Sequence, residues 1–217
     1  MKWKGIVFDF DYTLGDSTKG IVSSINYAMK KLGHQNYPEE AIRKTVGLSL
    51  IDTYQQLTGD ENSEHAGIFA SCFRDKADEV MASHTQLYPG VLEGLREWKK
   101  AGLKLGIVTT KYHYRIDQIL KLCHGEGIFD RIVGGEDVER EKPDPEGLLF
   151  CIDAWGMKKE EVLYVGDSLV DAKTAKNAGV PFCAVTTGTT DEEAFRPFPH
   201  VGIHKSVNHL IHMEHLT

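Results

Sequence analysis

Two aspartates near the start of the chain are spaced so that they could act together on one ion or substrate. Asp9 and Asp11 follow the apolar run 6–8 directly, with one residue between them. In an extended chain, side chains at i and i+2 lie on the same side. Two close carboxylates repel, so one would keep its proton at neutral pH unless a cation lies beside them. Mg²⁺, which prefers oxygen ligands, would remove that repulsion; the alternative is that both are ordinary turn residues.

Later segments supply further polar groups of a particular kind. Thr109 ends a predicted strand, and its hydroxyl can donate to a phosphate oxygen. Lys142 lies just before a predicted helix that begins with proline. Asp167 ends another predicted strand, and Asp171 lies near the start of the helix that follows, where the backbone dipole favours negative charge. Each has a plain structural interpretation, but together they are the groups needed to hold Mg²⁺ and a phosphoryl group.

The elements that carry these residues differ between two parts of the chain. Between residues 16 and 84 the spacing of apolar residues predicts helices and no strand, over 16–32, 38–46, 50–57 and 63–84. Elsewhere helices and strands alternate. Strands are predicted at 6–8, 103–109, 131–133, 162–165, 182–185 and 201–203, and helices at 89–101, 112–122, 145–155, 170–178 and from 207.

Alternation of this kind predicts an α/β fold with a parallel sheet and helices on both of its faces. The carboxyl ends of parallel strands meet at one edge of a sheet, where open α/β sheets bind their ligands. The polar residues named above should therefore converge there. We expect two domains, an α/β core made of residues 1–15 and 87–217 and a helical insertion made of residues 16–86.

Composition narrows the class of partner. The chain has 217 residues, with 41% hydrophobic and 26% charged residues, which is typical of a globular protein. Its formal net charge of −7 argues against nucleic acid or an anionic membrane as a partner. No apolar run approaches the length of a membrane span, and no signal peptide precedes the first strand, so we expect a cytoplasmic protein. The four cysteines show no CxxC spacing and are expected to be reduced thiols.

Taken in order, these residues form a set of motifs that resembles the haloacid dehalogenase superfamily. The first motif is DFDYTL, the second is Thr109, the third is Lys142 and the fourth is GDSLVD. Within that superfamily, the segments YPGV, KPDP and VGDSLVDAKTAKNAGV are similar to the phosphoglycolate phosphatase-like group. The resemblance implies a Rossmann-like parallel sheet core with an inserted all-helical cap domain.

The resemblance also implies a role for each acid. Asp9 would be the nucleophile that forms an aspartyl-phosphate, and Asp11 the general acid and then the general base. The chemistry agrees, because an ionised carboxylate can attack in line while a second acid protonates the leaving oxygen and later activates water. Mg²⁺ would be held by Asp9, the backbone carbonyl of Asp11 and Asp167, with Asp171 either in contact with it or one step removed.

On the substrate side, Thr109 and Lys142 would hold the phosphoryl oxygens and offset the charge that spreads over them. Thr110 and Lys111 follow Thr109 directly and are expected to bind substrate as well. Two departures from the family pattern affect the leaving-group pocket. Thr110 stands where relatives often have asparagine, and Tyr12 stands where the family usually has glycine. If position 12 needs a positive φ, tyrosine costs about 1–2 kcal/mol there.

The helical insertion offers its own candidates for substrate binding. Gly47 interrupts the helices predicted at 38–46 and 50–57, and a break of this kind exposes backbone N–H groups. Arg43 lies one turn upstream and could meet the carboxylate of a substrate such as 2-phosphoglycolate through its two-pronged donor geometry. The alternative is a plain turn between two helices.

We therefore expect an Mg²⁺-dependent phosphatase that hydrolyses a small phosphate monoester similar to phosphoglycolate. An inorganic pyrophosphatase and a phosphomutase of the β-phosphoglucomutase type could use the same core. A phospho-accepting signalling module also places Asp, Thr and Lys at strand ends, but receiver domains are about half as long and arrange their acids differently. A dehalogenase is disfavoured, because that chemistry needs no acid at Asp11. The oligomeric state stays open.

Overall fold

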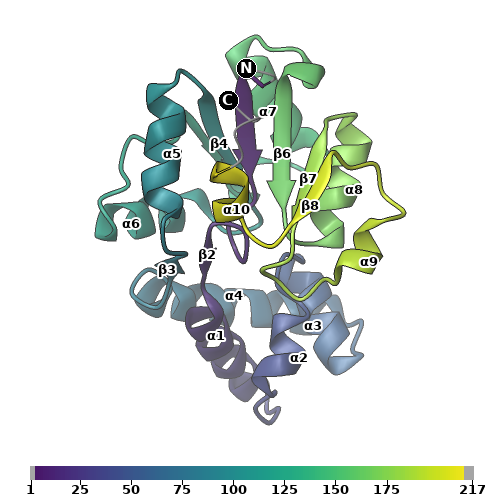
Figure 1. Cartoon of the computed structure of the whole chain (residues 1–217). Coiled ribbons are helices and arrows are strands. Elements are labelled where there is room, and N and C mark those ends of the chain that lie inside the picture. Colours follow the sequence, from purple (N-terminus) through teal and green to yellow (C-terminus); the bar gives the residue numbers. More distant parts are fainter. Residues whose placement is uncertain (1–2, 213–217) are drawn as a thin grey trace. The chain divides into compact units, whose positions relative to one another are not determined.

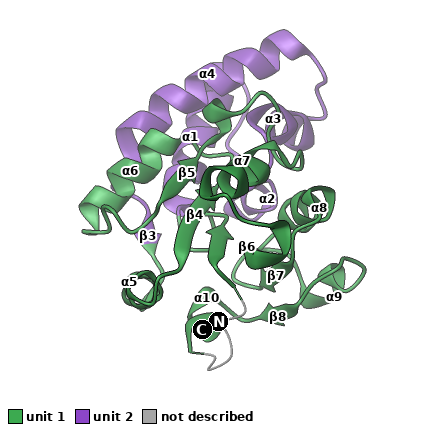
Figure 2. Cartoon of the chain, turned by 90° about the horizontal axis from the view of Figure 1, so that it is seen from above, with its two compact units in different colours: residues 1–16, 87–217 green, residues 17–86 purple. Residues whose placement is uncertain are grey.

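The structure, a computed structural model, describes residues 3–212. The chain forms two compact units, one made of residues 1–16 and 87–217 and the other of residues 17–86 (Figure 2). Within residues 3–212, no helix is both long and apolar enough to cross a membrane.

A six-stranded sheet forms the centre of the first unit (Figure 1). Its strands lie in the order β5-β4-β1-β6-β7-β8, and every neighbouring pair is parallel. Their bounds are β1 (Gly5–Phe8), β4 (Lys104–Val108), β5 (Arg131–Val133), β6 (Val162–Gly166), β7 (Phe182–Val185) and β8 (Gly202–His204). This arrangement confirms the predicted parallel sheet. The side chains of β1 are buried on both faces, which explains its uninterrupted apolar run.

Helices cover both faces of this sheet. They are α5 (Val91–Lys100), α6 (His113–Leu122), α7 (Glu146–Trp155), α8 (Leu169–Ala178), α9 (Glu192–Phe195) and α10 (Val207–Ile211), with two short 3₁₀ helices, η1 (Gly135–Asp137) and η2 (Lys159–Glu161). One apolar core joins α7 and α8 to the sheet through Val7, Tyr164 and Phe182. On the other face, the Trp98 ring of α5 stacks on Phe8 at 6.2 Å between ring centroids.

The second unit consists of four helices, α1 (Thr18–Lys31), α2 (Glu39–Arg43), α3 (Leu50–Thr58) and α4 (Ser63–Val80). Apolar side chains of α1, α3 and α4 form its core, with Met29, Tyr54 and Phe69 fully buried. Side-chain caps begin two of the helices, since Ser49 accepts from the Asp52 N–H and Asn62 from two N–H groups of α4. The apolar residues that recur at helical spacing in the sequence thus lie on the face of each helix that packs into this core.

Two short strands, β2 (Gly15–Asp16) and β3 (Gln86–Leu87), pair with each other and carry the chain between the units. The expectation of no strand from residue 16 onwards is therefore wrong by one residue, Asp16. Ser17 also differs from expectation, because its side chain does not cap α1. Its hydroxyl instead accepts from Thr85 Oγ1 over 2.9 Å.

Other helices end earlier than predicted, and α9, η1 and η2 were not predicted at all. The helix expected to reach residue 46 ends at Arg43, and the chain turns through to Gly47, whose φ is 93°. The helix expected to reach residue 84 ends at Val80. There the Val80 carbonyl accepts both from the Ser83 hydroxyl and from the His84 N–H.

The four cysteines are free thiols, as expected. Cys151 and Cys183 are buried in the first unit, and burial raises the pKa of each to about 12. Neither thiol is therefore a ready nucleophile, because the thiolate is the reactive form.

Candidate active site

Asp9 lies directly after β1, in the middle of the sheet and at its carboxyl edge. The Asp9 N–H donates to the carbonyl of Val165 over 2.9 Å, which continues the parallel pairing of β1 with β6 by one residue. The carboxylate is almost completely buried. A charged group at this depth needs a counter-charge within reach.

Lys142 supplies that counter-charge and joins two carboxylates. Its Nζ lies 2.7 Å from Asp9 Oδ1 and 2.7 Å from Asp171 Oδ1, and it also donates to the Tyr164 hydroxyl over 3.3 Å. Burial acts to lower the pKa of Lys142, but Asp171 and Asp9 outweigh it and hold that pKa well above its usual value. The ammonium group therefore stays charged at the centre of the site.

Asp171 is tied to its own helix as well. It is the third residue of α8, and its Oδ2 accepts from the Ser168 N–H over 3.1 Å and from the Ser168 hydroxyl over 2.6 Å. Its Oδ1 accepts from Lys142 and, over 2.9 Å, from the Tyr164 hydroxyl. The helix-capping interpretation of Asp171 is thus correct, and the same carboxylate also holds Lys142.

Asp167 follows β6, close to the loop after β7. Its Oδ1 accepts from Thr13 Oγ1 over 3.0 Å. Gly188 lies against its other oxygen, because a Cβ at Gly188 would lie 1.9 Å from Asp167 Oδ2. Only glycine fits at that point without displacing the carboxylate.

Three of the carboxylates form a group that fits a divalent cation. One oxygen each of Asp9, Asp167 and Asp171 lies within 4.8 Å of the others, and all three side chains are buried. A donor set made only of carboxylate oxygens suits Mg²⁺.

The charges of the site support the same conclusion. Burial raises the pKa of Asp9 to about 7, against the attraction of Lys142 and with added repulsion from Asp171 and Asp11. Burial and the repulsion of Asp171 and Asp9 raise the pKa of Asp167 well above its usual value. The buried carboxylates of the site outnumber its buried ammonium groups. The carboxylates are those of Asp9, Asp11, Asp167 and Asp171, and the ammonium groups are those of Lys111 and Lys142. A divalent cation would supply the missing positive charge.

The Asp11 carboxylate is not one of the three that lie within 4.8 Å of one another, and the expected place of Asp11 beside the ion stays a prediction. The chain does not stay extended after Asp9, because Asp11 forms a bridge with Gly15 and a turn lies between them. Asp11 Oδ2 lies 3.3 Å from Lys111 Nζ. Asp11 Oδ1 is buried and has no hydrogen-bond partner among the residues described.

Tyr12 adopts the left-handed backbone conformation in which tyrosine is strained. Its φ is 61°, and its side chain is 1% exposed. The Tyr12 N–H donates to the Gly15 carbonyl over 2.8 Å, and the Thr187 hydroxyl donates to the Tyr12 carbonyl. Tyrosine in this region costs about 1–2 kcal/mol, which the surrounding contacts must offset.

The loop after β4 carries three of the expected residues, Thr109, Thr110 and Lys111. Thr109 is buried, and its N–H donates to the Val133 carbonyl over 3.1 Å. The Thr109 hydroxyl accepts from the Lys111 N–H over 3.2 Å, and Lys111 reaches Asp11. Thr110, between them, is half-buried.

Arg43 and Gly47 belong to the second unit. Arg43 Nη1 donates to Thr18 Oγ1 over 3.4 Å. Gly47 lies in the turn between α2 and α3 with a positive φ. Their proposed contact with substrate stays a prediction.

Several residues with contacts in the site were missed by the sequence analysis. Tyr164 had a signal, since it is a hydroxyl-bearing residue inside an apolar buried strand, and a buried tyrosine usually finds a hydrogen-bond partner. Ser168 also had a signal, since a serine three residues before an acid at a helix start is typical of a capping box. Thr13, Thr187 and Gly188 had none, because each acts on a residue that only the fold brings near.

Comparison with known proteins identifies the family. A sequence model of haloacid dehalogenase-like hydrolases matches residues 6–185. Pyrophosphatase PpaX from Bacillus cereus (strain AH820) is 33% identical over 200 residues, covering 91% of this chain and 91% of that protein. A solved structure from Bacteroides fragilis, described as a haloacid dehalogenase-like hydrolase, is 40% identical with a TM-score of 0.93, covering 96% of this chain and 100% of that one.

A more distant likeness concerns the fold alone. A solved structure from Haemophilus somnus, described as a predicted phosphoglycolate phosphatase, is 24% identical with a TM-score of 0.84, and the match covers 97% of each chain. The motifs, the sheet and the family match all agree. The chain therefore belongs to the haloacid dehalogenase-like hydrolase family.

Proposed function

We propose that this hydrolase is a phosphatase that cleaves small phosphate monoesters through a phosphorylated Asp9, with Mg²⁺ as its cofactor. The observation that carries the proposal is the buried Lys142, whose Nζ lies 2.7 Å from both Asp9 and Asp171 at the carboxyl edge of the sheet. A fixed cation beside a buried carboxylate stabilises the charge of a phosphoryl group that is transferred to that carboxylate.

In the first step, an oxygen of Asp9 attacks the phosphorus atom. The bond from phosphorus to the leaving oxygen breaks as the acyl phosphate forms, and Asp11 protonates the leaving alcohol. In the second step, Asp11 takes a proton from the attacking water, and phosphate leaves Asp9. Lys111, which lies 3.3 Å from Asp11, stabilises the Asp11 carboxylate between these steps.

The phosphoryl oxygens would be held by Lys142 and by the Thr109 hydroxyl. Asp9 and Asp167 would hold Mg²⁺ together with the Asp11 carbonyl, and the ion would neutralise part of the phosphoryl charge. Asp171 supports this set by holding Lys142, since each of its oxygens already has two donors.

The substrate class rests on two separate arguments. Resemblance to the phosphoglycolate phosphatase-like group favours a small phosphate monoester with a carboxylate, for which Arg43 in the helical unit would be the partner. The relative from Bacillus cereus, in contrast, is named a pyrophosphatase, which makes inorganic pyrophosphate the second candidate. A phosphomutase remains a third candidate on the same core, because it would form the same aspartyl-phosphate.

The test is phosphate release from a panel of phosphoesters with and without Mg²⁺. The panel includes 2-phosphoglycolate, pyrophosphate, an aryl phosphate and a hexose phosphate whose isomers are also measured. We expect Mg²⁺-dependent hydrolysis of a monoester and no activity in Asp9→Asn. Isomer exchange without phosphate release would make the protein a mutase. Phosphate release that Asp9→Asn retains would contradict the proposed mechanism.

A further inference from the structure

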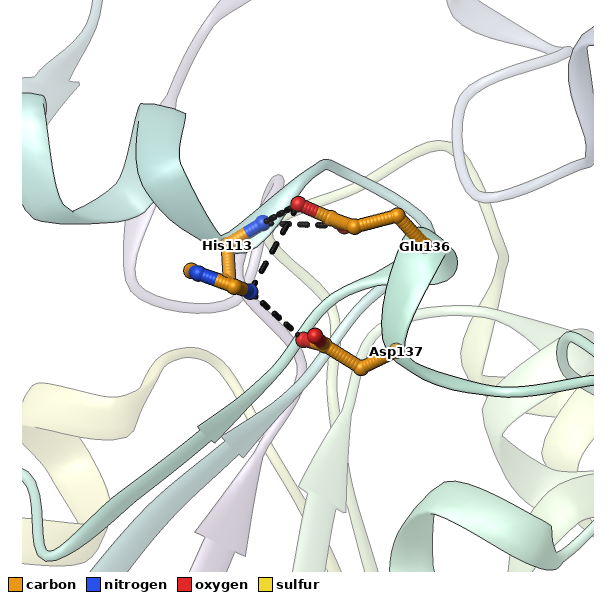
Figure 3. A group of neighbouring side chains, drawn as sticks. All are labelled: His113, Glu136 and Asp137. Carbon is orange, nitrogen blue, oxygen red and sulfur yellow. Dashed lines mark hydrogen bonds and ion pairs between the residues drawn. The ribbon is translucent and has the colours of Figure 1, made fainter.

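A second group of polar side chains joins the connections that follow β4 and β5 (Figure 3). His113 is the first residue of α6, whereas Glu136 and Asp137 belong to η1. Figure 3 shows both carboxylates turned toward His113 from the neighbouring connection. None of the three was expected from the sequence to have a role.

Both the backbone and the ring of His113 are held. Its N–H donates to the two carboxylate oxygens of Glu136 over 2.9 and 3.1 Å. Its ring Nδ1 lies 2.7 Å from Asp137 Oδ2, which also accepts from the Gly134 N–H over 2.8 Å. Burial acts to lower the pKa of His113, but Asp137, Glu136 and Asp117 outweigh it and raise that pKa above 6.5. The ring is therefore charged over a wider pH range than a free histidine.

These side chains have the types of a metal site, but their ligand atoms already make hydrogen bonds to a helix N–H, to the Gly134 N–H and to each other. The geometry thus fits a connection between two loops better than a place for an ion.

The two loops also touch through their backbones. A Cβ at Gly134 would lie 2.4 Å from the His113 nitrogen and 2.8 Å from the Lys111 carbonyl oxygen. A Cβ at Gly135 would lie 2.8 Å from the Thr110 carbonyl oxygen. The Gly135 N–H donates to the Lys111 carbonyl over 3.3 Å. Two glycines therefore let the segment 134–137 lie directly against residues 110–113.

The loop supported in this way carries Lys111 to the site. Its Nζ is buried and lies 3.3 Å from Asp11 Oδ2. Only Tyr112 separates Lys111 from His113, and one residue spans at most about 3.6 Å, so fixing His113 also limits where the Lys111 backbone can lie.

We propose that His113, Glu136 and Asp137 form a latch that positions Lys111 beside Asp11. The inference rests on the proposed function, in which Asp11 gives and takes the proton. Glu136 and Asp137 are positioning residues, because they act on the reaction only through His113 and Lys111. When the latch opens, Lys111 leaves the Asp11 carboxylate, and the proton steps slow.

A double-mutant cycle tests this coupling. Glu136→Gln with Asp137→Asn removes both charges and keeps both shapes. We expect this variant to lower kcat about tenfold on an alkyl phosphate, which corresponds to a rise of about 1.4 kcal/mol in the barrier. KM should change less than about twofold. The loss should shrink on an aryl phosphate, whose leaving group needs less protonation. In a Lys111→Met background the same two substitutions should cause no further loss.

Asp117→Asn is the matched control. Asp117 lies one turn along α6, and its charge acts on His113, but it takes no part in the hydrogen bonds of the latch described above. We expect its kcat to stay within about twofold of the parent. Equal losses from the latch variant with and without Lys111 would show a general structural role and overturn the proposal, as would an unchanged kcat in the latch variant.

A measurement without substrate separates this proposal from the proposed function. Amide hydrogen exchange at residues 110–113 should become faster in the latch variant and stay unchanged in Asp117→Asn. If the wild-type protein hydrolyses none of the panel, the proposed function fails, but exchange still decides whether the latch holds the loop. Unchanged exchange would overturn the latch. If the double variant does not fold, Asp137→Asn alone gives the same comparison with a smaller expected change.

Discussion

The hydroxyl of Tyr164 allows a sharp test of how the site is held together, because removing it changes a single oxygen atom. It donates to Asp171 Oδ1 over 2.9 Å and accepts from Lys142 Nζ over 3.3 Å, and all three side chains are buried. The ring packs against Phe182 at 6.2 Å between centroids, a contact that does not involve the oxygen. Tyr164→Phe therefore removes hydrogen bonds and leaves the core packing in place.

The expected loss follows from the charge of the partner. A hydrogen bond to a charged group contributes about 1.5–3 kcal/mol, and a buried oxygen has little water to replace it. We expect Tyr164→Phe to lower the free energy of unfolding by about 2 kcal/mol. Lys142 keeps its two carboxylates but loses its third partner, so we also expect kcat to fall about tenfold.

Urea unfolding and steady-state kinetics on the same preparations provide the assay. Ser168→Ala is the matched control, because it removes one donor, the hydroxyl, from the other oxygen of Asp171 without touching Lys142. It should cost about 1 kcal/mol as a lost helix cap, with a smaller effect on kcat. A loss below about 0.5 kcal/mol in Tyr164→Phe would refute the reasoning, because the hydroxyl would then contribute less than an ordinary hydrogen bond.

Four further predictions concern separate parts of the chain. Asp9→Asn should abolish turnover with an unchanged circular dichroism spectrum, and a variant that kept a tenth of the activity would remove Asp9 from its role. Arg43→Ala should reduce kcat/KM on 2-phosphoglycolate but not on an uncharged aryl phosphate; parallel losses would count against a carboxylate contact. Gly188→Ala places a Cβ 1.9 Å from Asp167 Oδ2 and should displace that carboxylate, so calorimetry should detect weaker Mg²⁺ binding. An unchanged affinity for Mg²⁺ would show that the loop moves to make room for the added methyl group. The charged His113 ring contributes its full stabilisation below pH 6.5, its ordinary pKa, and this contribution is lost as the pH rises through the raised pKa of the folded state. The free energy of unfolding should therefore fall over that pH range in the wild type and not in His113→Gln.

Much of the fold could be predicted from the sequence, because its signals are local. Apolar runs with β-branched residues mark buried strands, and helical spacing marks the helices between them. The strands at 131–133 and 182–185 were predicted with the bounds that the structure has. Helix ends were less certain. At Val80 and at Ser17 a side-chain hydroxyl found a partner that spacing alone does not reveal.

The sequence also determined which residue types stand at the strand ends. Asp9, Thr109 and Asp167 follow strands of one parallel sheet, so their meeting at its carboxyl edge follows from topology alone. The motif comparison also marked position 12 as one where a positive φ would make tyrosine costly, and the backbone of Tyr12 has a positive φ.

The tertiary structure alone decided how these groups divide their contacts. Asp171 both caps its helix and holds Lys142, whereas Asp11 pairs with Lys111. The contact of Thr13 with Asp167 joins residues 154 positions apart. Such contacts depend on the register of the strands and on where each loop turns, and these are set by packing across the whole unit. Periodicity and propensity describe only near neighbours along the chain, which is why they indicated the chemistry of the site but not its pairing.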